Sequence, residues 1–214
     1  MTRIIFVRHG ESTGNFTDRF YGHTDGELTE LGRKQAECAA AYLKDFKIDI
    51  AYASDLKRAY ETGVIIAKEH GLDVIPKKEL REINAGEWEN RTFSELAVLY
   101  PKEFDTWKHD MWRVELPEGE SIKQMTYRIR DAVWKIAEEN DGKTVLIAFH
   151  STPIRSLTCE WKGLAYEEIS NVGWVKNASV SIVNYDVHDH TSEPEIIGYA
   201  DFQGDMQKEV TSSI

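Results

Sequence analysis

Three short apolar runs, each followed at once by polar residues, constrain the fold of this chain most. They lie within residues 3–7 (RIIFV), 48–53 (IDIAYA) and 143–149 (KTVLIAF). Apolar runs of this length, bounded by polar residues, predict buried strands. Segments with helical periodicity separate them, and strands that alternate with helices form a largely parallel sheet covered on both faces. We therefore predict an α/β fold with three layers, in which helices lie on either side of a central sheet.

The helices are predicted from periodicity and from their N-caps. Thr29 and Asp55 are residue types that cap helices well, and each precedes apolar residues at helical spacing. Ser121 begins another helix, because Ser121 and Gln124 match a capping box. Pro76 indicates that its own short strand lies at an edge of the sheet. The predicted helices cover residues 29–46, 55–70, 121–140, 153–160 and 166–171, with short helices within 92–116, and the further strands cover 74–76, 178–185 and 195–202.

The length of 214 residues fits one domain. We predict a single domain over residues 1–214, with residues 92–116 as a candidate lid and residues 203–214 as a polar, flexible tail. The aromatic residues of the candidate lid suit a mobile cover and a plain hydrophobic core equally well. Cys38 and Cys159 are interpreted as buried free thiols, since two cysteines do not make a disulfide framework in a chain of this length.

The net charge of −11, from 26 basic and 37 acidic residues, argues against nucleic acid and anionic membranes as partners. Both of these ligands need a basic face on the protein. No apolar stretch approaches the ~18 residues that span a bilayer, and the N-terminal apolar run is too short for a signal peptide. We therefore expect a cytoplasmic protein that binds a small molecule, and the sequence makes no prediction of its oligomeric state.

Polar residues with useful chemistry follow the buried strands directly. In largely parallel sheets, ligands bind beyond the carboxyl ends of the strands. An acidic chain that binds an anion needs a local positive pocket, and we expect it at this edge of the sheet. The residues that follow the three strands are Arg8-His9, Ser54-Asp55 and His150-Ser151-Thr152.

Arg8 and His9 are the strongest candidates in this set. Arg8 alone is consistent with an ion pair to Glu11, because a buried cation needs a partner. With His9 beside it and His150 after another strand, an anion clamp is the preferred interpretation. No metal site is predicted, because HExxH and CxxC spacings are absent and the His188–His190 pair lies in a polar segment typical of a solvated turn.

The stretch RHGES over residues 8–12 resembles the signature of the histidine phosphatase superfamily, which includes cofactor-dependent phosphoglycerate mutases and many small phosphatases. A single motif of this kind is moderately specific, but five further segments resemble the family in the same order. They are YGHTDGELTELGRKQA (21–36), SDLKRAYET (54–62), LREINAGEWEN (80–90), PEGESIKQMTYRI (117–129) and FHSTPIR (149–155). The resemblance implies a phosphoglycerate mutase-like α/β/α fold and phosphoryl-transfer chemistry.

The resemblance also implies roles for individual residues. His9 is the implied nucleophile, which forms a phosphohistidine with the substrate. Phosphoryl transfer places negative charge on three equatorial oxygens. A planar arginine guanidinium can donate two hydrogen bonds to such oxygens, and a helix N-terminus also attracts them. Neither a metal nor another cofactor is implied. The implied phosphate-binding residues are Arg8, Asn15, Arg58, His150 and Ser151.

Glu82 is the implied catalytic acid and base. It would protonate the leaving alkoxide and then deprotonate the attacking water, and for the first role its pKa must be raised by burial or by nearby phosphate. Without the resemblance, Glu82 is interpreted as a surface residue paired with Arg81. Composition alone does not exclude the neighbouring Glu79, Glu87 and Glu89 from the same role.

The chain departs from the family pattern at a few positions. Ser151-Thr152 stands where the family usually has glycine or a small residue after the second histidine. Ala85 replaces a bulky apolar residue, and Glu27 replaces a common proline. These departures affect the expected substrate more than the expected activity.

The preferred prediction is a metal-independent phosphatase that hydrolyses a small organic phosphomonoester through a phosphohistidine. The first alternative is a cofactor-dependent phosphoglycerate mutase. The mutases of the family are longer chains, however, with an added segment between the Glu82 region and the helix that here starts at Ser121. The alternative from another class is a non-catalytic module that binds a phosphorylated ligand. The presence of His9 and Glu82 argues against that module.

Overall fold

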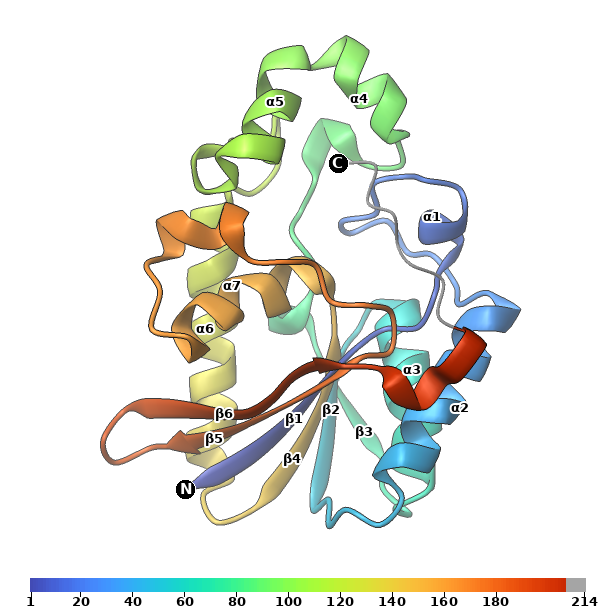
Figure 1. Ribbon diagram of the computed structural model, residues 1–214, viewed down its shortest axis with the longest axis vertical. Helices are drawn as coiled ribbons and strands as arrows, with labels where there is room; N and C mark the ends of the chain where they lie inside the picture. Colours follow the sequence, from blue (N-terminus) through green and yellow to red (C-terminus); the bar gives the residue numbers. More distant parts are fainter. Residues whose placement is uncertain (207–214) are drawn as a thin grey trace.

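A six-stranded sheet runs through the centre of the molecule (Figure 1). The computed structural model of the chain describes residues 1–206. The strand order is β3-β2-β4-β1-β5-β6, and only the pairs β1–β5 and β5–β6 are antiparallel. This confirms the predicted, largely parallel sheet. The strands are β1 (Thr2–Arg8), β2 (Ile50–Ser54), β3 (Val74–Lys77), β4 (Thr144–Phe149), β5 (Val180–Asp186) and β6 (Thr191–Tyr199).

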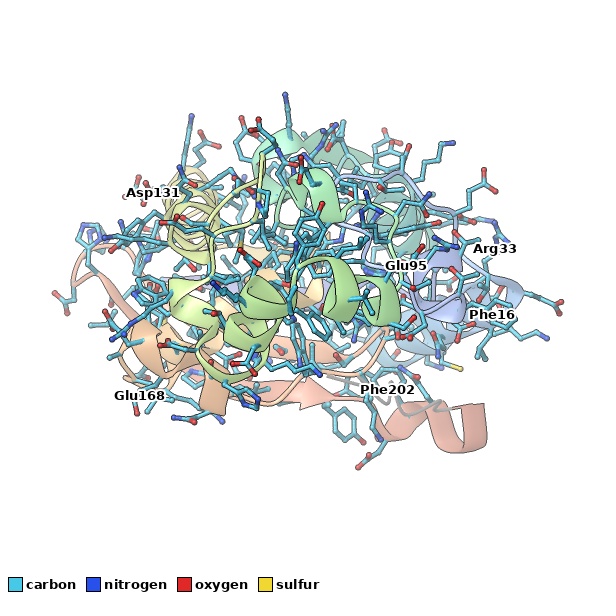
Figure 2. All side chains as sticks on the ribbon, turned by 90° about the horizontal axis from the view of Figure 1, so that it is seen from above. Phe16, Arg33, Glu95, Asp131, Glu168 and Phe202 are labelled. Carbon is cyan, nitrogen blue, oxygen red and sulfur yellow. The ribbon has the colours of Figure 1, made fainter. Side chains whose placement is uncertain are left out.

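Helices cover both faces of the sheet, with α2 and α3 on one face and α6 and α7 on the other (Figure 1). Seen from above, Arg33 of α2 and Asp131 of α6 lie at opposite sides of the molecule (Figure 2). The helices α4 and α5 lie beyond the carboxyl ends of the central strands. The α-helices are α1 (Thr13–Phe16), α2 (Glu30–Leu43), α3 (Lys57–Lys68), α4 (Phe93–Leu99), α5 (Pro101–His109), α6 (Ile122–Glu139) and α7 (Ser151–Trp161). The 3₁₀ helices are η1 (Lys78–Leu80), η2 (Gly86–Trp88), η3 (Met111–Arg113), η4 (Tyr166–Asn171) and η5 (Asp201–Met206).

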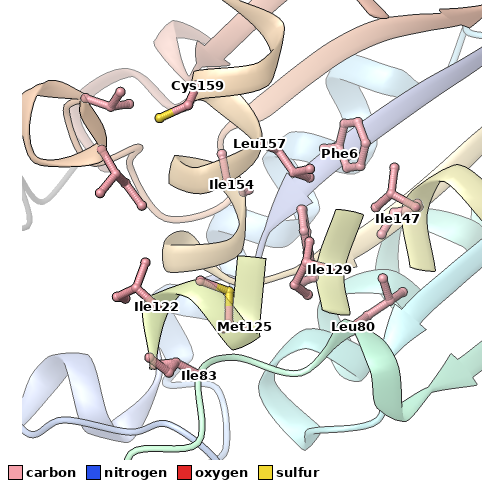
Figure 3. Packing of buried hydrophobic residues seen from close by; sticks show 14 of the residues in the cluster. Phe6, Leu80, Ile83, Ile122, Met125, Ile129, Ile147, Ile154, Leu157 and Cys159 are labelled. Carbon is pink, nitrogen blue, oxygen red and sulfur yellow. The ribbon is translucent and has the colours of Figure 1, made fainter. Parts of the chain in front are cut away.

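The central strands build a separate core on each face of the sheet, because successive side chains of a strand point to opposite faces. Ile5 and Val7 of β1 pack in the core that contains α2 and α3. Phe6 of β1 packs instead in the core that contains α6 and α7, together with Ile129 and Leu157 (Figure 3). Strands that are buried on both faces have no polar positions between their apolar ones. This is why the strands were predictable as continuous apolar runs.

Two of the predicted helix caps are confirmed and one is wrong. Thr29 caps α2, and Ser121 forms the predicted capping box at the start of α6. Asp55 does not cap α3, whose N-cap position is Leu56. The Asp55 carboxylate instead accepts two hydrogen bonds, both 2.6 Å, from Nε and Nη2 of Arg81. Such a bidentate, charge-assisted pair is stronger than a single capping bond.

The boundaries of helix α7 and strand β6 also differ from the prediction. Helix α7 begins at Ser151, two residues before the predicted start. Strand β6 covers 191–199 rather than 195–202, because a tight turn at residues 187–190 returns the chain at once to pair Thr191 with Asp186. The turn contains the His188–His190 pair, as predicted. Strand β3, which contains Pro76, is an edge strand, also as predicted.

Residues 92–116 fold into α4, α5 and η3, and their aromatic side chains are largely core. Trp107 is buried and lies 5.0 Å from Phe20 and 6.0 Å from Trp88 between ring centroids. Phe104 is buried in the same cluster. Contrary to the expectation of a flexible tail from residue 203 onward, Gln203 lies in η5 and is buried. The rest of the predicted tail, residues 207–214, lies outside the described residues.

Neither cysteine of the chain forms a disulfide. Cys159 is buried and free, as predicted, whereas Cys38 is free but only partly buried. Within residues 1–206, none of the helices combines the length and the apolar character that crossing a bilayer requires.

Candidate active site

The predicted site residues converge where β1 and β4 end side by side. The two strands pair in parallel, and Arg8 lies opposite Phe149. The backbone N–H of His9 donates to the Phe149 carbonyl at 2.9 Å. This register places the His9 and His150 rings against each other, 5.3 Å apart between centroids and with their planes at 61°. His9 and His150 thus lie together at the carboxyl edge of the sheet.

The His9 ring is oriented by the next residue of the chain. His9 Nδ1 lies 2.7 Å from the Gly10 carbonyl oxygen, which can only accept, so Nδ1 carries the proton. The unprotonated Nε2 is then the nucleophilic nitrogen. Burial lowers the pKa of His9 well below its ordinary value, and Arg58 and Arg8 lower it further. A neutral, nucleophilic imidazole follows.

Gly10 allows a close approach of the loop to α2. A Cβ at Gly10 would lie 2.2 Å from the carbonyl oxygen of Gly32. The backbone of Gly10 is not left-handed, so it is the close approach that requires glycine here. Glu11 lies at the same contact, where its carboxylate accepts from the Thr29 hydroxyl at 2.8 Å.

Arg8 and Arg58 are buried cations without a carboxylate partner within 4 Å in the described part of the chain. Arg8 donates through Nη1 to the Val175 carbonyl, and burial lowers its pKa to about 10, although Glu82 raises it in part. Arg58, in the first turn of α3, donates to the carbonyls of Thr24 at 2.9 Å and Gly22 at 2.8 Å. Burial lowers the Arg58 pKa as well.

Asn15 is fixed by contacts to its carboxamide oxygen. Oδ1 accepts from the Ser12 backbone at 3.1 Å, from the Ser12 hydroxyl at 3.0 Å and from Asn177 Nδ2 at 3.3 Å. The oxygen is therefore fully used, and the Asn15 amide nitrogen is the group that can donate to a ligand.

Asn177 was not found by sequence reasoning. It is buried, and besides Asn15 it donates to the His9 carbonyl at 3.1 Å. Gln203 Nε2 in turn donates to the Asn177 carbonyl at 2.7 Å. The segment before β5 and the turn η5 thus hold the loop that follows β1. An asparagine before a predicted strand carries no sequence signal for such a role.

Glu82 is buried, and its carboxylate lies against the first turn of α7. Its carboxylate accepts from the Ile83 N–H at 2.9 Å and from the Thr152 N–H at 3.2 Å. Burial raises the pKa of Glu82, while these two hydrogen bonds and Arg58 act in the opposite direction. The alternative interpretation, a surface pair with Arg81, is wrong, because Arg81 binds Asp55.

The other glutamates near Glu82 are engaged elsewhere. Glu89 accepts from the backbone N–H groups of Gly22, Thr24 and Ala85 and so holds the loop before α2. Glu87 accepts from the Tyr100 hydroxyl at 2.9 Å, and Glu79 is exposed. Among these residues only Glu82 has its carboxylate at the start of α7.

Arg128 and His23 hold the backbone of Glu82 from outside. Arg128 of α6 donates through Nη2 to the Glu82 carbonyl at 3.1 Å and forms an ion pair with Glu120 at 2.7 Å. His23 Nε2 lies 3.0 Å from the same carbonyl oxygen, which accepts its proton. The contact from Arg128 holds the Glu82 backbone from a helix, which is a more rigid support than a loop.

Ser151 and Thr152, which stand where the family usually has glycine or a small residue, lie at the start of α7. The Thr152 N–H is directed to Glu82, and the Thr152 side chain is buried. Ser151 is the first residue of α7 and half-buried. Ser151 therefore stands at the positive end of the helix, where an anion is favoured. Ala85 is fully buried.

Two buried nitrogens of the site lack a hydrogen-bond partner within residues 1–206. They are Arg8 Nε and His150 Nδ1. A buried donor without a partner costs roughly 1–3 kcal/mol, and few such groups occur in folded proteins. Both belong to the residues that the sequence assigned to anion binding. The same part of the chain holds no group of three or more His, Cys, Asp or Glu side chains placed to bind a metal ion.

Residues 4–193 match the model of the histidine phosphatase superfamily, branch 1. The chain belongs to this superfamily. It is 32% identical over 184 residues to phosphoserine phosphatase 1 of Hydrogenobacter thermophilus, which covers 86% of this chain and 87% of that protein. It is also 32% identical over 189 residues to the probable phosphoglycerate mutase GpmB of Yersinia pestis, which covers 86% of each. The solved structure of Bacillus stearothermophilus YhfR superposes with a TM-score of 0.90 at 27% identity, covering 95% of this chain and 100% of that one.

Membership of the superfamily confirms the predicted fold and the predicted class of enzyme. The chain is a histidine phosphatase with the phosphoglycerate mutase-like α/β/α fold.

Proposed function

We propose that this histidine phosphatase hydrolyses a small organic phosphomonoester in the cytoplasm, with His9 as nucleophile and Glu82 as acid and base. The observation that carries the proposal is the His9 ring, which Gly10 holds with Nε2 unprotonated beside the uncompensated cations Arg8 and Arg58. A phosphoryl group supplies both the charge that these cations lack and the electrophile that a neutral imidazole attacks. The net charge of −11 disfavours nucleic acid and anionic membranes as partners.

In the first step, His9 Nε2 attacks phosphorus while the ester P–O bond breaks. The product is a phosphohistidine on His9 and an alkoxide. Catalysis of this step consists mainly of positioning and of stabilising charge on the equatorial oxygens. We assign that task to Arg8, Asn15, Arg58, His150 and Ser151. The His150 ring lies against the His9 ring, Arg58 and Arg8 lower the His9 pKa, and Ser151 begins α7.

Glu82 moves the protons. Its raised pKa keeps a proton available for the leaving alkoxide, and a bound phosphate dianion would raise that pKa further. In the second step, water attacks phosphorus and gives its proton to Glu82 while the P–N bond to His9 breaks, and inorganic phosphate leaves. The scheme balances without a metal ion, and it predicts activity in the presence of a chelator.

Phosphoserine is the first substrate to test, because one relative is a phosphoserine phosphatase. Phosphoglycerate mutase activity is the second candidate, which the likeness to GpmB favours. The two activities share the first step and differ in whether water or a bound glycerate accepts the phosphoryl group.

The test is a panel of phosphomonoesters assayed with chelator, with a mutase assay alongside. We expect hydrolysis that survives the chelator and falls by at least about 10⁴-fold in His9→Ala, as for the loss of other nucleophiles. The matched control is His188→Ala, an exposed turn histidine, which should keep full activity. Full activity of His9→Ala would refute the proposed role of His9. Phosphoryl transfer to glycerate in preference to water would identify the enzyme as a mutase.

A further inference from the structure

His150 has one side-chain hydrogen-bond partner in the described part of the chain, the hydroxyl of Ser54. The distance from His150 Nε2 to Ser54 Oγ is 2.8 Å, and both residues are fully buried. Ser54 is the last residue of β2, and its Oγ also accepts from the Leu56 N–H at 3.3 Å. The second ring nitrogen of His150, Nδ1, is buried and has no partner within residues 1–206.

Both tautomers of a neutral His150 can share a hydrogen bond with Ser54, but only one of them gives the Ser54 hydroxyl proton an acceptor among the described residues. With the proton on Nδ1, the Leu56 N–H donates to Ser54, and the Ser54 hydroxyl donates to the bare Nε2. With the proton on Nε2, His150 would donate to Ser54, and the Ser54 proton would have no acceptor in the same buried place. Nδ1 would then present a lone pair, which repels an anion.

We propose that Ser54 is a positioning residue that fixes the Nδ1–H tautomer of His150, so that Nδ1 is the donor to the phosphoryl oxygens. The neighbouring His9 ring, 5.3 Å away between centroids, marks the side on which the phosphoryl group lies. Burial, together with Arg58 and His9, lowers the His150 pKa, so the ring is neutral and its tautomer decides what it can donate. The two histidines are thereby divided in role. His9 keeps its proton on Nδ1, which donates to the Gly10 carbonyl, and attacks through Nε2, whereas His150 accepts at Nε2 and donates through Nδ1.

The role in catalysis rests on the proposed function, but the tautomer does not. It can be measured in the ligand-free wild-type enzyme by ¹⁵N NMR of histidine-labelled protein, with His150→Asn used to assign the signals. We expect a protonated Nδ1 and an unprotonated Nε2 on His150. Inorganic phosphate should then shift the Nδ1 signal more than the Nε2 signal. A proton on Nε2 would overturn the inference, whether or not the enzyme is active.

Ser54→Ala and Ser54→Thr test the link to turnover. Ser54→Ala should lower kcat/KM by about tenfold, the effect of one buried hydrogen bond, and should give a mixture of His150 tautomers. Ser54→Thr keeps the hydroxyl and should restore the wild-type tautomer and part of the activity. The matched control is Ser181→Ala, another buried strand serine, whose Oγ accepts from Gly198 N–H at 2.9 Å and which should change kcat/KM less than twofold.

The outcomes separate this inference from the proposed function. If the wild-type protein has no phosphatase activity but His150 is protonated on Nδ1, the proposed function is refuted and the inferred tautomer stands. Full activity and an unchanged tautomer in Ser54→Ala would remove the positioning role alone. If Ser54→Ala does not fold, the wild-type spectrum and Ser54→Thr still decide the question.

Discussion

The arginines near Glu82 fall into two sets, which differ in whether a carboxylate pairs with them. We call Arg8 and Arg58 the inner cations, and the pairs Arg81–Asp55 and Arg128–Glu120 the outer ion pairs. Each outer arginine meets a carboxylate, at 2.6 Å and 2.7 Å respectively. The inner cations meet backbone carbonyls, and no carboxylate lies within 4 Å of them in the described residues.

The pKa values follow this division. Asp55 raises the pKa of Arg81 through a direct hydrogen bond. Burial lowers the pKa of Arg8 to about 10 and also lowers that of Arg58. A cation that is paired within the protein is already satisfied and serves to hold the backbone around Glu82. A buried cation without such a partner is destabilised until an anion binds, and so it marks the place of the phosphoryl group.

The largest effect is expected for the carboxylate between the two sets. Glu82→Gln should lower the rate of phosphoryl transfer from the substrate to His9, measured in a single turnover, about 10²–10⁴-fold for an alkyl phosphate, because the leaving alkoxide loses its proton donor. The loss should be much smaller on an activated aryl phosphate, whose leaving group needs no proton. The control is Glu79→Gln, an exposed neighbour. Equal losses on both substrates would take the acid role away from Glu82.

The comparison itself is tested by exchanging an inner and an outer arginine for methionine. Inorganic phosphate at about 100 times its Kd should stabilise the wild-type enzyme by about 2.7 kcal/mol. Arg8→Met should lose most of this gain, since its cation lies in the phosphate site. Arg81→Met should keep the gain even if its starting stability is lower. Thermal unfolding with and without phosphate measures both, and equal gains in the two variants would break the distinction.

The buried histidines predict how stability depends on pH. Burial and Arg58 lower the pKa of His150, so the folded state leaves it neutral while the unfolded state takes up a proton below about pH 6.5. Stability from this group is therefore present above pH 6.5 and is lost as the pH falls. Its slope is at most about 1.4 kcal/mol per pH unit. Glu82, whose pKa is raised, contributes with the opposite sign.

This dependence is measured by urea unfolding at pH 7 and pH 5. Wild-type stability should fall more between these values than that of His150→Asn, and saturating phosphate should reduce the difference because the anion favours the protonated ring. An identical pH dependence in both proteins would mean that His150 is not held neutral by the fold.

The smallest effect is expected for a pair that lies outside both sets. Arg33 and Glu61 form an exposed ion pair at 2.6 Å. Arg33→Gln should change the free energy of unfolding by less than about 0.5 kcal/mol, as for other surface pairs, and should leave kcat/KM unchanged. A clear loss of activity there would show that charge outside the site also matters.

Much of this site could be predicted because its parts lie next to strong signals. Arg8, His9 and His150 directly follow apolar strands, and the carboxyl ends of parallel strands meet at one edge. Glu82 and Arg58 follow no such rule and were assigned only through the family resemblance. Sequence periodicity says nothing of the burial that raises the Glu82 pKa.

The residues that were missed depend on contacts between distant parts of the chain. Asn177 holds the His9 carbonyl across 168 positions of sequence, and Gln203 is buried against Asn177 although it lies in a polar stretch. Asp55 was predicted to cap α3, but the side chain of Arg81 competes for its carboxylate. Each of these outcomes is decided by a long side chain whose direction local sequence does not specify.

The most direct test of the account is to trap the covalent intermediate. Glu82→Gln should accumulate phosphate on the enzyme when an activated aryl phosphate is added, because loss of the base slows hydrolysis of the phosphohistidine. After rapid quenching in alkali, peptide mass spectrometry should find one acid-labile phosphoryl group on the peptide that contains His9, and none in His9→Ala. Phosphate on another residue, or turnover by His9→Ala at the wild-type rate, would contradict the account.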